Sequence, residues 1–143
     1  MIATEQAAEF CDLLNDYLMA RYGYKTKLAK LMPGLRIHVS RSHVHLYARL
    51  RPNTAIWGED TLVIAKLGFK EIGKGNGTSF LKFLAASAPV LGMKHIGIEQ
   101  AQTLPMINFV QKYNFEQVYV VSNWKISLDN LSLILNSDLI SST

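Results

Sequence analysis

The stretch TLVIAKLGFKEIGKGNGTSFLKFL, residues 61–84, decides the fold class of this chain. It opens with nine residues that are almost all apolar, which is typical of a central strand buried on both faces. Three glycines at alternate positions come next, and the apolar residues after them recur at the spacing of a helix face. A strand that passes through a glycine-rich turn into a helix indicates a mixed α/β domain.

The rest of the chain continues this alternation of strands and helices. Thr4 is the expected cap of the first helix and Gly23 its end. We predict a helix over 4–22, strands over 36–40, 43–51 and 61–69, a helix over 78–88, a strand over 94–99, a helix over 103–113, and strands over 116–122 and 123–128.

Composition bounds the class of protein. The 143 residues suit one domain, and 49% hydrophobic with only 18% charged residues excludes a disordered polyelectrolyte. The net charge of +4 favours anionic partners without choosing among them. The single cysteine, Cys11, is expected in the core, which fits a reducing compartment. We read no secretory leader and no apolar run of membrane-spanning length, so a cytoplasmic protein is expected.

The glycine-rich turn has two interpretations from its residues alone. A helix start offers free N–H groups and the positive end of the helix dipole, and glycine lets a phosphate approach the backbone. Lys74 adds a mobile positive charge. The turn matches neither G-x-x-x-x-G-K-[ST] nor G-x-G-x-x-G. A phosphate-binding loop and a purely structural turn therefore both stay open at this point.

A wider stretch, at about 60–122, resembles the GCN5-related N-acetyltransferase (GNAT) superfamily. In that family a buried strand leads into a loop of the form R-G-x-G-x-G/A that opens a helix, and here residues 73–77 read GKGNG. The family's next helix ends in a phrase like fYekyGF, and residues 109–115 read FVQKYNF. The resemblance implies a mixed, mostly antiparallel sheet flanked by helices, in a single domain over 1–143 whose acetyl-CoA-binding core is about 60–122.

The resemblance also implies acetyl-CoA as cosubstrate and assigns residues to it. The loop amides would bind the pyrophosphate, so Gly75 and Gly77 would have to stay small, and a backbone N–H of the buried strand would contact the thioester carbonyl. The implied cofactor-binding residues are Leu67, Gly68, Phe69, Gly73, Lys74, Gly75, Asn76, Gly77, Thr78 and Thr103.

Three positions depart from the family pattern. Ile72 stands where a basic residue opens the loop, and Thr103 stands where an Asn often starts the second helix. Val110 replaces the Tyr that often protonates the departing thiolate. Tyr113 lies three residues later and is the candidate for that acid, from a different direction. These departures leave open a catalytically impaired GNAT-like binding or regulatory protein that keeps the fold, with or without CoA binding.

The general base has several candidates. Glu59 lies just before the buried strand and Glu99 ends the next strand, near where the two central strands separate in the family; both also fit solvated carboxylates. A neutral imidazole is a second route. His38, His43 and His45 lie on the early strands, where exposed sheet positions explain them equally well. His43 and His45 lack a Cys or acidic cluster beside them, so no metal site is predicted.

The acceptor is not named by these residues. The resemblance implies an amine-bearing acceptor, which an acidic protein or a nucleic acid could carry, and it leaves open a homodimer. A separate hypothesis is a nucleic-acid binder that uses Arg36, Arg41, Arg49 and Arg51 around Tyr47. Thiol release from acetyl-CoA discriminates the enzyme from both binding proteins.

Overall fold

The computed structural model describes residues 3–71 and 73–137, with the side chains of residues 120 and 121 left aside. The described elements are α1 (Thr4–Tyr22), β1 (Lys30–Met32), β2 (Arg36–Ser40), β3 (Val44–Arg49), α2 (Thr54–Trp57), β4 (Thr61–Phe69), α3 (Asn76–Ser87), the 3₁₀ turn η1 (Ala88–Leu91), β5 (His95–Ile98), α4 (Leu104–Lys112), β6 (Glu116–Val118), β7 (Val120–Ser127) and α5 (Leu128–Leu135).

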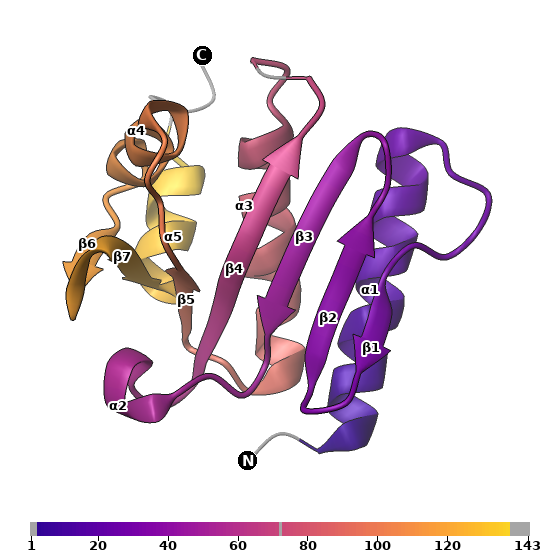
Figure 1. Ribbon diagram of the computed structural model, residues 1–143, viewed down its shortest axis with the longest axis horizontal. Coiled ribbons are helices and arrows are strands. Elements are labelled where there is room, and N and C mark those ends of the chain that lie inside the picture. The colour runs from indigo at the N-terminus through magenta and orange to yellow at the C-terminus, as the bar shows by residue number, and fades with distance from the viewer. Residues whose placement is uncertain (1–2, 72, 138–143) are drawn as a thin grey trace.

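One sheet of seven strands, in the order β1-β2-β3-β4-β5-β7-β6, organises the molecule. Only the β4–β5 pair is parallel, and every other neighbouring pair is antiparallel. Helices α1, α3 and α5 lie behind the sheet, α4 lies beyond the end of β5, and α2 lies at the start of β4 (Figure 1). The predicted mixed α/β fold with a mostly antiparallel sheet flanked by helices is confirmed.

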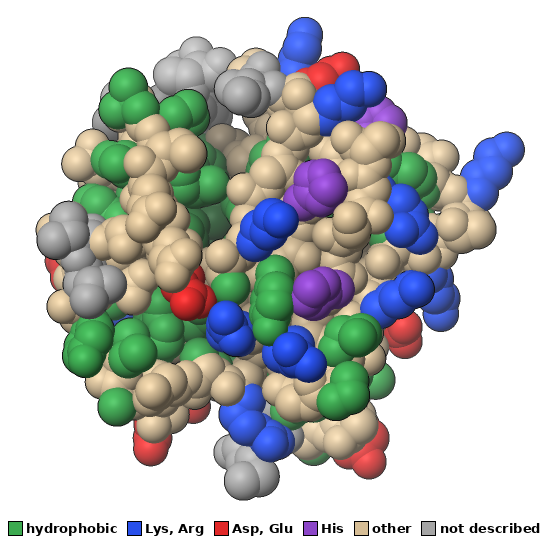
Figure 2. All heavy atoms as spheres, viewed as in Figure 1, with side chains coloured by type: hydrophobic (Ala, Val, Ile, Leu, Met, Phe, Trp, Pro, Cys, Tyr) green, Lys and Arg blue, Asp and Glu red, His purple; other side chains and the backbone are tan. Residues whose placement is uncertain are grey.

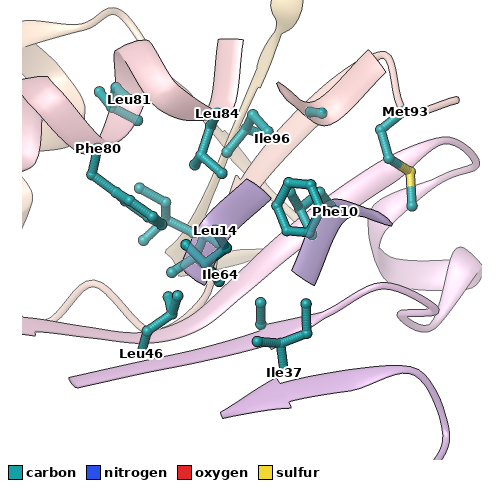
Figure 3. Close-up of a cluster of buried hydrophobic side chains, with 14 of the residues drawn as sticks. Phe10, Leu14, Ile37, Leu46, Ile64, Phe80, Leu81, Leu84, Met93 and Ile96 are labelled. Carbon is teal, nitrogen blue, oxygen red and sulfur yellow. The ribbon is translucent and has the colours of Figure 1, made fainter. Parts of the chain in front are cut away.

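The hydrophobic core lies between the sheet and the helices behind it (Figure 3). Phe10 and Leu14 of α1 and Leu84 of α3 face Leu46 and Ile64 of the sheet, and all five are almost fully buried. The alternation predicted for β3 appears in its burial, because Val44, Leu46 and Ala48 are buried and their neighbours are not. Strand β3 therefore has one face toward the helices and one face away from them.

Several elements differ from the sequence prediction. The strand β1 and the helices α2 and α5 were not predicted, and the boundary between β6 and β7 lies at Tyr119, which has a positive φ of 62°. The first helix is capped at Ala3, whose N–H donates to Gln6 Oε1 at 2.9 Å, and not by Thr4. Short elements such as these depend on side-chain caps and sheet pairing, which periodicity does not reveal.

The helices described here include none that is both long and apolar enough to cross a membrane. Cys11 is buried as predicted, and burial raises the pKa of its thiol. A raised pKa keeps the thiol protonated and unreactive at neutral pH.

Candidate active site

The central strands β4 and β5 separate halfway along β4. They pair only from Thr61 to Ile64, and the last contact is the Glu99 N–H, which donates to the Ile64 carbonyl at 3.0 Å. Beyond that point β4 continues to Phe69 and pairs with β3 alone. Backbone N–H groups alternate between the two edges of a strand. The far half of β4, which includes Leu67 and Gly68, therefore has an edge that β5 does not cover.

The separation has a local cause at the end of β5. Gln100 has a positive φ of 54°, which is uncommon for a residue with a side chain. Its N–H donates to Asn123 Oδ1 at 3.1 Å, and the Ala101 N–H donates to the Ser122 carbonyl at 2.8 Å. The chain after β5 thus follows β7 away from β4. Sequence reasoning missed Gln100 and Asn123, because no motif marks a left-handed glutamine.

The glycine-rich loop joins the far end of β4 to α3. Gly73 and Gly75 have φ values of 79° and 76°, a backbone conformation that favours glycine. An added Cβ would meet nothing within 4 Å at either position, so these two glycines border open space. Gly75 is the N-cap of α3 and provides no side-chain cap. The first N–H groups of the helix, beginning at Asn76, therefore lack the partner that a cap would provide.

A polar cavity of about 390 Å³ lies beside this loop. Its lining combines the loop with the end of α1 and the start of β3, and consists of Arg21, Tyr22, His43, Glu71, Lys74 and Asn76. Two of these side chains, Arg21 and Lys74, are cationic and one, Glu71, is acidic, which leaves a positive balance at the positive end of the α3 dipole. The cavity therefore has the electrostatic character of an anion site.

The side chain of Asn76 is part of the framework of this cavity. It is buried, and its Oδ1 accepts from Arg21 Nε at 2.9 Å and from the Tyr22 hydroxyl at 3.0 Å. Its Nδ2 donates to the Glu71 carbonyl at 3.1 Å. Burial raises the pKa of Tyr22, so its hydroxyl stays a donor at neutral pH. Asn76 therefore ties α1 to the loop, and the backbone N–H of this residue, not its amide side chain, is left for a ligand.

The first turn of α3 also contacts α4. A Cβ on Gly77 would lie 2.6 Å from Phe109 Cε1, so this glycine is small because an aromatic ring packs on it. The Thr78 hydroxyl forms a hydrogen bond with the Tyr113 hydroxyl, and Tyr113 is fully buried. The structure thus gives Gly77 a packing reason for its size, where the sequence suggested the approach of a phosphate.

The three candidate catalytic residues occupy different places. Glu99 lies where β4 and β5 separate, and its Oε2 accepts from Arg49 Nε at 3.3 Å. Tyr113 lies inside the α3–α4 contact. Glu59 is exposed and precedes the start of β4, at the end of the strand away from the glycine loop. A strand of nine residues spans roughly 25 Å, so Glu59 is remote from the glycine loop. Glu99 lies about halfway along β4, where its N–H donates to the Ile64 carbonyl.

The remaining predicted positions are placed as follows. Thr103 is the N-cap of α4, where its Oγ1 accepts from the Met106 N–H at 3.4 Å. Val110 is fully buried, so the position where the family has a tyrosine points into the core. Ile72 lies outside the described residues. His43 packs against Tyr22, while no three potential metal ligands come together within residues 3–71 and 73–137.

Comparison with solved structures supports the fold. The chain is similar to Mycobacterium smegmatis RimJ in complex with CoA-disulfide, with a TM-score of 0.51 and 11% sequence identity over 99% of this chain and 86% of that chain. RimJ is a GNAT protein, and the likeness shows a GNAT-like fold for this chain. No family model matches the chain, and no curated protein matches it in sequence.

Proposed function

We propose that this chain is an N-acetyltransferase that transfers an acetyl group from acetyl-CoA to an amine acceptor, with a CoA-binding core at about 60–122. The observation that carries the proposal is the uncapped start of α3 beside a cationic cavity, at the end of the strand that separates from its neighbour. The fold comparison supports it, because the similar RimJ structure contains a CoA derivative.

The loop residues would hold the phosphates of CoA. Gly73 and Gly75 leave open space at the backbone, the first N–H groups of α3 can donate to phosphate oxygens, and Lys74 can neutralise their charge. Asn76 holds the loop in this conformation through its bonds to Arg21 and Tyr22. These residues therefore fit a phosphate-bearing ligand without any further change in the side chains.

The uncovered edge of β4 would orient the thioester. An N–H among Leu67, Gly68 and Phe69 that points away from β3 can donate to the carbonyl oxygen and stabilise the negative charge that develops there. Acetyl-CoA supplies the activated acetyl group and a thiolate leaving group. The chain's own contribution is to hold the thioester between the separated strands and to exclude water from it.

Glu99 is the proposed base for the incoming amine. It lies at the separation of the strands, and the contact with Arg49 fixes its carboxylate there. The amine must lose a proton as its nitrogen bonds to the carbonyl carbon, and a positioned carboxylate contributes about 10²–10⁴-fold to such a step. Thr103, at the start of α4, and Thr78, in the first turn of α3, would flank the bound CoA.

The experiment is a thiol-release assay with acetyl-CoA and a panel of amines and proteins. Wild type should release CoA faster with a suitable acceptor than without one. Glu99→Gln should lower the rate by about 10²-fold or more, while Glu59→Gln, just before the start of β4, should leave it unchanged. Equal rates in the two variants would remove Glu99 from the mechanism, and no acceptor-dependent release in wild type would contradict the proposed activity.

A second function is favoured by the burial of Tyr113 and Val110. Neither side chain reaches solvent, so the family's usual acid has no accessible counterpart on α4. A GNAT-like protein that binds CoA without transfer is the function that this observation supports. Acceptor-dependent thiol release by wild type would exclude this second function. Tyr113→Phe then tests the acid, because an acid role predicts a fall in turnover at unchanged CoA affinity. A purely structural contact with Thr78 predicts unchanged turnover and a lower melting temperature.

A further inference from the structure

One face of the sheet over β1–β4 carries no helix (Figure 1). These four strands contain no Asp or Glu, and their cationic and aromatic side chains alternate with the buried ones. We call this surface the open face and define it by Lys30, Arg36, His38, Tyr47, Arg49 and Lys66. Figure 2 shows Lys, Arg and His side chains gathered over this part of the molecule. The open face is therefore a positively charged surface with rings at its centre.

The strand register places these side chains in rows across the sheet. Lys30 lies opposite His38, His38 opposite Tyr47, and Tyr47 opposite Lys66. Neighbouring strands are about 4.8 Å apart, so this row puts one cation on each side of two adjacent rings. The rings of His38 and Tyr47 have centroids 4.3 Å apart. Their planes are tilted by 53°, so the row presents two adjacent tilted rings, the His38–Tyr47 platform, between two lysines.

A second row puts two arginines directly opposite each other. Arg36 pairs with Arg49 across β2 and β3, and like charges in this position destabilise a sheet. Tyr47 lies between them, and its hydroxyl accepts from Arg36 Nη1 at 3.2 Å and from Arg49 Nη1 at 3.5 Å. Among the described ion pairs, a carboxylate reaches this row from Glu99, which contacts Arg49. Arg36 faces no carboxylate among the contacts described, so an arriving anion would relieve the repulsion.

The two guanidinium groups are held in place before any ligand arrives. Arg36 Nε donates to the Pro33 carbonyl at 2.9 Å, and Arg49 Cζ lies 4.9 Å from the centroid of the Tyr47 ring. An ordered side chain loses less conformational entropy on binding than a free one. The open face is thus preorganised for anionic groups at fixed positions.

We propose that the open face binds single-stranded nucleic acid, with phosphates on its four cations and bases stacked on the His38–Tyr47 platform. Phosphates explain the charge, and the π faces of bases explain why rings occupy the centre of the row. An acidic polypeptide would use the charge and leave the platform without a role. The proposal does not rest on acetyl transfer, because the open face shares no residue with the glycine-loop cavity, although its Arg49 also contacts Glu99.

The experiment is fluorescence anisotropy of a labelled oligouridylate of about 12 nucleotides, titrated with the protein without CoA. Wild type should bind at about 50 mM salt, and the logarithm of the binding constant should fall with the logarithm of salt with a slope near −3 for four cations. Absence of binding at this salt concentration, or a slope near zero, would overturn the proposal.

Three variants locate the site. His38→Ala removes an exposed ring and should weaken binding at least about fivefold, the effect of one stacked base. Lys66→Glu should weaken binding by a similar factor or more and reduce the slope by about 0.7. Lys82→Glu makes the same charge change on α3, behind the sheet, and should bind as wild type does. All three positions are exposed, so equal melting temperatures should accompany these differences.

The class of ligand is decided by competition. Unlabelled oligouridylate should displace the probe at concentrations far below those needed for polyglutamate of similar length and charge. Equal displacement by polyglutamate would replace nucleic acid with an acidic polypeptide as the partner. Equal losses in Lys66→Glu and Lys82→Glu would show binding by net charge alone and would also overturn the proposal.

Discussion

The two ends of β4 differ in how their polar groups are satisfied. At the α2 end, other groups of the protein satisfy the polar atoms of the turn. Asn53 caps α2, and the Trp57 carbonyl accepts from both Thr61 Oγ1 and Lys125 Nζ. The Trp57 ring lies over Gly97, where an added Cβ would be 2.5 Å from it. The turn between α2 and β4 is thus closed by packing and hydrogen bonds within the protein.

At the other end, the described part of the glycine loop provides no side-chain cap for α3. Gly75 caps α3 without a side-chain acceptor, and a polar cavity adjoins the loop. Buried backbone donors in native proteins are nearly always paired. In a turn with a purely structural role, we expect the polar groups to be paired within the protein, as they are in the turn at the α2 end. A helix start that lacks a cap and adjoins a polar cavity is instead suited to an anionic ligand.

The largest expected effect is at the closed end. Trp57→Ala should lower the free energy of unfolding by about 3–5 kcal/mol, because it empties a buried site over Gly97. Chemical denaturation measures this loss, and Trp57→Phe should lose less. Added CoA should still stabilise the Trp57→Ala variant, because the glycine loop lies at the other end of β4. A loss below about 1 kcal/mol would show that the Trp57 ring contributes little to the stability of the α2 end.

A smaller effect distinguishes two kinds of glycine within the loop and helix. Gly77→Ala brings a methyl group against Phe109 and should cost about 1–3 kcal/mol through overpacking. Gly73→Ala should cost about 1–2 kcal/mol through its positive φ alone. Adding Phe109→Leu should recover part of the first loss and none of the second. Equal recovery in both double variants would contradict the packing explanation for Gly77.

The smallest expected effect is a pH dependence at the closed end. His95 Nδ1 is buried without a partner, and burial, followed by the charge of Lys125, lowers the pKa of this imidazole. The unfolded chain then takes up the proton first, so stability should fall as pH drops from about 6.5 toward the lower folded pKa. His95→Gln should flatten this part of the stability curve. An NMR titration that gives His95 a pKa at or above about 6.5 would contradict the assignment.

The sequence predicted the long elements well and the short ones poorly. The nearly continuous apolar run of nine residues predicted the limits of β4, and the alternation in β3 predicted its buried face. The expectation that β4 is buried on both faces held only for Thr61–Ile64, where β5 pairs with it. The separation of the strands depends on Gln100 and Asn123, a pair joined only in the folded chain.

In the candidate site, too, the local pattern was predictable from the sequence and the long-range contacts were not. The loop was recognisable because its glycines carry a local pattern, and two of them do have positive φ. The pattern did not reveal the contacts of Gly77 with Phe109 and of Asn76 with Arg21, because these partners are distant in the chain. Residues whose neighbours are distant in sequence carry no periodic signal, whatever their importance.

The most direct test of the account is CoA binding by the glycine loop, measured by melting curves and calorimetry. CoA at 100 times its dissociation constant should stabilise wild type by about 2.7 kcal/mol and raise the melting temperature by about 5–11 °C. Lys74→Glu should weaken CoA binding by about tenfold or more through repulsion of phosphate, while Lys82→Glu, farther along α3, should bind like wild type. No shift in wild type at millimolar CoA, or equal affinity in the two variants, would contradict the claim that this loop binds phosphate.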